Sequence, residues 1–132
     1  MVFTVRATIE VLGYPEDHVK TTIEKVVEKL KNEEGIKIIK SEIQKTEKIK
    51  ENFFASFAET EMKINDFSRL LNFCYNYLPS SLEILDADKI TLPIREFSMG
   101  INEMLAKLHH YNLVVNNLSN KVMELKKENT SK

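Results

Sequence analysis

The feature that most constrains the fold of this chain is an apolar seven-residue repeat near its C-terminal end. From Ile94 to Leu125 the apolar residues recur at steps of three and four without interruption. A repeat sustained over five heptads predicts a helix with one apolar seam that packs against another helix. The a positions hold Ile94, Ile101, Leu108, Val115 and Val122, and the d positions hold Phe97, Met104, Tyr111, Leu118 and Leu125.

The length of this helix decides what it can do. Pro93 can occupy the first helical position, so we expect a helix over residues 93–128, followed by a disordered tail over 129–132. Such a helix is roughly 54 Å long, whereas a head formed by residues 1–92 has a diameter of roughly 32 Å. One head cannot cover the whole seam. Whether the helix is continuous or broken near residue 117 stays open.

We therefore interpret the C-terminal helix as an oligomerisation device. Mostly β-branched a positions, with Leu at the last two d positions, favour a parallel dimer. The partner is a second copy of the chain or a helix of another protein, and the sequence leaves both open. The expected interface residues are Ile101, Met104, Leu108, Tyr111, Val115, Leu118, Val122 and Leu125.

The first 92 residues predict an α+β domain. Val5, Ala7 and Ile9 alternate with polar residues, which is typical of a half-buried strand. Apolar residues at helical spacing then run up to Gly35, and a second helix starts at the N-cap residue Asn65. The expected elements are a strand over 5–11, a helix over 16–34, strands over 36–43 and 53–64, a helix over 65–78 and a strand over 81–92, with residues 45–52 as a polar connection.

This β-α-β-β-α-β order predicts a ferredoxin-like arrangement, an antiparallel sheet with both helices on one face. The RNA-recognition motif and ACT-type regulatory domains share this order. The third strand, however, lacks the glycine of the RNA-recognition pattern, and Glu59 and Glu61 would face the phosphates. We expect no nucleic-acid partner and keep RNA binding through the sheet as a second alternative.

Composition excludes several classes of protein. A net charge of −1 argues against a general polyanion binder. The single cysteine, Cys74, excludes an intramolecular disulfide framework and a multi-cysteine metal site. No uncharged run is long enough for a membrane span, so we expect a cytoplasmic protein. The Lys, Glu and Ile bias is typical of archaeal or AT-rich bacterial proteins.

The sequence predicts no catalytic residue, no metal site and no cofactor, which favours a protein that is not an enzyme. The adjacent residues His109 and His110 point about 100° apart on a helix and do not chelate one ion together. The alternative function is a small-molecule-sensing module with a site between paired heads. The residues expected to line that ligand or partner surface are Phe53, Phe57, Phe73 and Tyr75.

Overall fold

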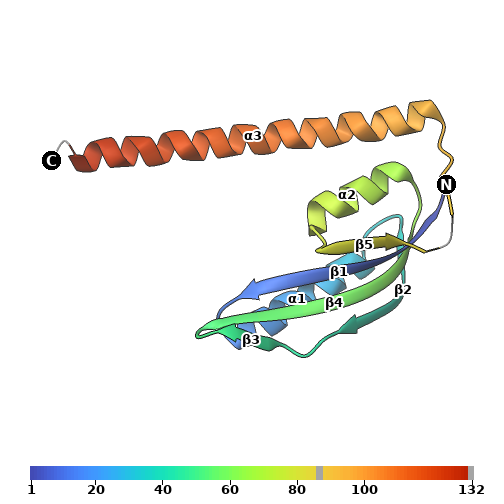
Figure 1. The fold of residues 1–132 in the computed structure, drawn as a ribbon, viewed down its shortest axis with the longest axis horizontal. Coiled ribbons are helices and arrows are strands. Elements are labelled where there is room, and N and C mark those ends of the chain that lie inside the picture. Colours follow the sequence, from blue (N-terminus) through green and yellow to red (C-terminus); the bar gives the residue numbers. More distant parts are fainter. Residues whose placement is uncertain (86–87, 131–132) are drawn as a thin grey trace. The chain divides into compact units, whose positions relative to one another are not determined.

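The protein is an α+β protein with a five-stranded antiparallel sheet and a long C-terminal helix (Figure 1). The structure is a computed structural model and describes residues 1–85 and 88–130. The chain divides into two compact units, residues 1–93 and residues 94 onward. The elements are β1 (Phe3–Gly13), α1 (Glu16–Lys31), β2 (Ile36–Ile43), β3 (Glu47–Lys50), β4 (Phe53–Ile64), α2 (Phe67–Tyr77), β5 (Ser81–Ile84) and α3 (Ile94–Thr130).

The sheet has the strand order β2-β4-β1-β5, and β3 pairs with β4 beyond the end of β2. β1 and β4 pair along their whole length, from Phe3 opposite Ile64 to Gly13 opposite Phe54. Alternate residues of both strands are buried, as strand periodicity requires for a sheet covered on one face. The core on the covered face includes Val5, Ala7, Ile9, Ala58 and Met62 of the sheet, Ile23, Val27 and Leu30 of α1, and Leu70 and Phe73 of α2.

Local signals explain where the two shorter helices begin and end. α1 starts after Pro15, with acidic residues in its first turn and basic residues in its last, which complements the helix dipole. It ends at Lys31, earlier than the expected residue 34. Gly35 follows at φ +80°, and a Cβ there would overlap the side chain of Arg69. α2 is capped by the Asp66 side chain, which accepts the Arg69 N–H at 2.8 Å, and not by the expected Asn65.

Two predictions about the sheet were wrong. Glu47–Lys50, expected in a connection, forms β3 against β4. The last strand, expected over 81–92, ends at Ile84, and residues 88–93 form no strand. The reason is the partner strand: the Leu85 N–H bonds to the Thr4 carbonyl, and β1 begins at Phe3. A longer β5 would therefore have no strand to pair with. Residues 86–87 of the expected strand lie outside the described residues.

α3 is one continuous helix of 37 residues, about 55 Å long. It begins one residue after Pro93 and has no break near residue 117. Residues 129 and 130 are helical, although the sequence predicted a disordered tail there, and residues 131–132 lie outside the described part. Within the described residues, no helix combines the length and the apolar character needed to cross a membrane.

Candidate interaction surfaces

The apolar seam of α3 is exposed along the C-terminal part of the helix. Every described residue from Leu108 onward is exposed, and the six seam residues there have exposed fractions between 47% and 59%. Ile101 and Met104 are partly buried. The structure therefore places the predicted interface residues on a single helix. The six exposed members of the seam are Leu108, Tyr111, Val115, Leu118, Val122 and Leu125.

An exposed seam of this kind is costly for an isolated helix. Most helical stability in proteins comes from packing of an apolar face, because helix propensity alone is marginal. A contiguous apolar surface that stays exposed to solvent marks an interaction site. Around Val115, Leu118 and Val122 the seam forms a wide, shallow apolar hollow, which also includes Ser119 and Met123. This surface is suited to another apolar helix.

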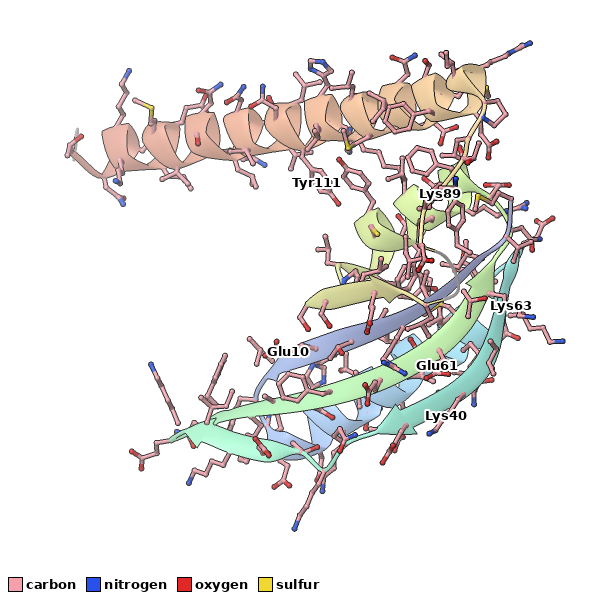
Figure 2. The ribbon with its side chains drawn as sticks, turned by 45° about the vertical axis from the view of Figure 1, so that its right-hand side comes forward. Glu10, Lys40, Glu61, Lys63, Lys89 and Tyr111 are labelled. Atoms are coloured by element: carbon pink, nitrogen blue, oxygen red, sulfur yellow. The ribbon has the colours of Figure 1, made fainter. Side chains whose placement is uncertain are left out.

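A second surface is the face of the sheet opposite α1 and α2, which we call the open face. Cross-strand neighbours on it form a row of alternating charge from β5 to β2, consisting of Glu83, Arg6, Glu61 and Lys40. Figure 2 labels Glu61 and Lys40 on adjacent strands of this face. Arg6 Nη2 lies 2.9 Å from Glu61 Oε1, and Arg6 Nη1 lies 3.4 Å from Glu83 Oε2.

The charged row borders a polar hollow of about 150 Å³, lined by Arg6, Lys40, Glu42, Glu59 and Glu61. The hydrogen bond from Arg6 to Glu61 raises the pKa of the guanidinium above its usual value. Arg6 is thus a charged structural residue that is already paired with carboxylates. Three acidic residues in one hollow repel phosphate, which weighs against RNA binding at this face.

A cluster of apolar side chains occupies one end of the open face. Ala55 is only 1% exposed although its side chain is on this face. Its neighbours there are Leu12 across the β1–β4 pair, and Phe53 and Phe57 two residues away along β4. Leu12 is 50% exposed and Phe53 is 38% exposed. These three large side chains surround the small alanine and remain accessible themselves.

The structure does not bring together the four residues expected to line a ligand or partner surface. Phe53 and Phe57 are on the open face of β4. Phe73 is 2% exposed in the core between α2 and the sheet, and its ring stacks on Tyr77 at 5.3 Å. Tyr75 is half-buried on α2. Within one chain the sheet separates the first pair from Phe73, and a site between paired heads stays a prediction.

A contact that the sequence did not predict joins the end of α1 to α2. The Tyr77 hydroxyl donates a 2.6 Å hydrogen bond to Glu33 Oε2, and Lys29 Nζ lies 5.7 Å from the ring centroid. Glu33 and Tyr77 are 44 positions apart, so no local spacing could have revealed the pair. The contact lies beside a polar hollow of about 240 Å³, which Arg69 also lines.

This contact predicts a fall in stability at alkaline pH. Burial is the main cause that raises the pKa of Tyr77 above the ordinary value of about 10, and the hydrogen bond to Glu33 raises this pKa further. The folded chain therefore holds the phenolic proton more tightly than the unfolded chain. The stabilisation is complete below pH of about 10 and is lost as the pH rises above it.

We expect the difference in unfolding free energy between the wild type and Tyr77→Phe to be constant below pH of about 10 and to shrink above it. Urea unfolding across this range measures the difference. Tyr14→Phe, at a ring that is 60% exposed, is the control and should keep the wild-type pH dependence. A difference that grows with pH would contradict the assignment.

The remaining candidate groups offer little chemistry. Burial raises the pKa of the Cys74 thiol, which disfavours the reactive thiolate. His109 and His110 are both exposed on α3. Among the described residues, no three His, Cys, Asp or Glu side chains are grouped so that they could hold a metal ion.

Comparison with known proteins gives a single result. The model of the MJ0538 family matches residues 4–132 of the chain. No match was found among curated proteins or among solved structures. The matched range includes all of the sheet except Phe3, and the whole described length of α3.

Proposed function

We propose that this chain, which belongs to the MJ0538 family, is an interaction protein that pairs with a second copy of itself through α3. The observation that carries the proposal is the exposed heptad seam from Leu108 to Leu125. Fully burying a Leu or Val side chain contributes about 1.5–3 kcal/mol. Several such residues from each copy would supply enough free energy to stabilise both the helix and the dimer.

The composition of the helix supports a second copy as the occupant. In a parallel, in-register pair, each a residue packs beside the same a residue of the partner, and each d residue beside the same d residue. Positions beside the seam are mostly uncharged, and Asn112, Val114 and Ser119 are examples. Few charges there oppose self-pairing. The exception is Lys121 at position g, which faces Lys126 at position e of the partner helix.

Light scattering on the full chain tests the proposal directly. A dimer has twice the chain mass of 15.3 kDa. We expect this mass at micromolar concentration and a gradual return to the monomer on dilution. A mass of 15.3 kDa at the highest soluble concentration would overturn self-association.

The Lys121–Lys126 pair provides a test of helix orientation. Lys121→Glu and Lys126→Glu should each tighten the parallel dimer, because each converts a like-charge contact into an opposite-charge contact. The change from a like-charge to an opposite-charge contact stabilises the dimer by about 0.5 kcal/mol at each contact. The dimer has two such contacts, so its Kd should fall about fivefold. Sedimentation equilibrium at low salt measures the change.

The double variant is the matched control for this prediction. Lys121→Glu together with Lys126→Glu restores a like-charge pair and should return the Kd to near the wild-type value. In an antiparallel dimer, position g faces g and position e faces e, so the two substitutions would not cancel. Additive effects in the double variant would therefore rule out the parallel arrangement.

We also propose that residues 1–93 are a ferredoxin-like domain with one added strand. The strand order β2-β4-β1-β5, with all neighbours antiparallel, supports this assignment. Residues of α1 and α2 share one core with the same side of β1 and β4, which also supports it. β3 then continues the edge that β2 begins.

A further inference from the structure

The edge of β1 is only partly covered by β5. β5 pairs with Val5–Thr8, and β1 continues to Gly13. Two further hydrogen bonds, from Ser80 N–H to the Thr8 carbonyl and from Leu85 N–H to the Thr4 carbonyl, close the ends of this pairing. Figure 1 shows the end of β1 extending past β5. Residues 9–13 therefore form a strand edge with β4 on one side and no strand of the described chain on the other.

The pairing pattern determines which backbone groups point away from β4. The carbonyl groups of Thr4 and Thr8 point toward β5. Because backbone direction alternates along a strand, the N–H and C=O groups of Glu10 and Leu12 point to the same side, beyond the end of β5. No hydrogen bond from the described residues reaches them there. Ile9 and Val11 point the opposite way, toward β4.

This edge lacks the features that usually keep strand edges apart. Exposed edges in natural proteins commonly carry Lys, Pro or a bulge, or are very short. Residues 9–13 read Ile-Glu-Val-Leu-Gly and contain one charge, and the bulges of this sheet are in β2 and β3. Leu12 is 50% exposed at the edge. The edge is thus open to an added strand.

We propose that the free edge of β1 pairs with the same edge of a second copy, antiparallel and centred on Val11. In this register Glu10 of each copy is directly opposite Leu12 of the other. The two residues of each such pair form two backbone hydrogen bonds, one from each N–H to the other residue's carbonyl. Each Glu10 carboxylate then lies opposite a leucine instead of another carboxylate. The accessible Leu12 side chains also meet diagonally across the new strand pair.

The side-chain pattern favours a second copy over an unrelated strand. The edge is self-complementary, because its one acidic residue and its one exposed leucine are on the same face and equally spaced from the centre at Val11. Val11 meets Val11 of the partner on the other face of the sheet. This interface is separate from the α3 seam, since it uses backbone groups of β1. It therefore goes beyond the proposed function and does not depend on it.

Amide hydrogen exchange by NMR on the full chain tests the proposal. The Glu10 amide should exchange slowly at high chain concentration and at least about tenfold faster after extensive dilution. The amides of Ile9 and Val11, which face β4, should stay slow at both concentrations and serve as internal controls. A Glu10 amide that exchanges at the same rate at both concentrations would overturn the proposal.

Two substitutions at position 12 test the register. Leu12→Glu places a carboxylate opposite Glu10 of the partner and should accelerate Glu10 exchange at least about tenfold, because like charges directly opposite are unfavourable. Leu12→Lys places an ammonium there and should keep the exchange slow. The intrinsic rate of the Glu10 amide is the same in all three proteins, since its immediate neighbours do not change.

Equal acceleration in the two variants would overturn the self-paired register. If Leu12→Glu fails to fold, the Ile9 and Val11 amides will also exchange fast. The comparison of Leu12→Lys with the wild type, together with the dilution series, then decides the question. Failure of the α3 dimer would appear separately, as a mass in light scattering that Leu118→Ala, a substitution in the α3 seam, leaves unchanged.

Discussion

Replacing Leu118 by Ala is expected to raise the Kd of the dimer at least about a hundredfold. Leu118 is a d residue in the exposed half of the seam, and it is 58% exposed in the single chain. Removing a buried leucine side chain typically costs 2–5 kcal/mol, and the dimer loses one from each copy. Because each 1.4 kcal/mol is a factor of ten, a loss near 3 kcal/mol already gives this change.

Leu113→Ala is the matched control for this prediction. It removes the same side chain from the same helix, at a residue with a similar exposed fraction of 61%. Leu113 is at position f, on the side of α3 away from the seam. Sedimentation equilibrium should show a Kd within a few-fold of the wild type for Leu113→Ala. Equal weakening by both substitutions would show that α3 associates without a defined seam.

The second large effect is expected in the core, where Phe73→Ala should lower the free energy of unfolding by about 3–5 kcal/mol. Phe73 is 2% exposed, and its ring stacks on Tyr77, so the substitution removes both burial and an aromatic contact. This is a large share of the total stability of a small domain. Urea unfolding followed by circular dichroism measures it.

Phe53→Ala is the comparison for the core prediction. Phe53 is 38% exposed on the open face, so its loss should cost about 1–2 kcal/mol. If Phe73→Ala leaves the fold intact and changes only binding, then the burial of Phe73 has been misassigned.

The sequence predicted the long, regularly patterned elements well. The strand over 53–64 and the strand over 36–43 have the observed limits, because their alternation and flanking turns are local signals. The long C-terminal helix was also predicted from its repeat. Phe53 and Phe57 lie on the open face of this strand among polar residues, and they surround Ala55 there.

Elements that depend on a distant partner could not be predicted in this way. β3 has the sequence Glu-Lys-Ile-Lys, whose polar character is typical of a loop, and it is a strand only because β4 extends beside it. β5 is short because β1 begins at Phe3. A strand extended to residue 92 would run past Phe3, the first residue of β1, and would still leave residues 9–13 of β1 unpaired on that side.

The same distinction applies to the candidate surfaces. The α3 seam is a pattern along one helix, so its residues could be named from the sequence alone. The free edge, the Glu33–Tyr77 contact and the charged row each join positions far apart in the chain. They require the strand register and the helix placement, which no local periodicity contains.

The charged row has a consequence for how the strands find their alignment during folding. A shift of β4 along β1 by two residues keeps every side chain on its own face, so the apolar alternation does not oppose it. One such shift would place Arg6 opposite Lys63, a like charge, whereas the other would place Arg6 opposite Glu59 and Glu61 opposite Thr4. Only the native alignment pairs Arg6 with Glu61 and Glu83 together. The row therefore disfavours the first of these two shifts, in which Arg6 would meet a lysine.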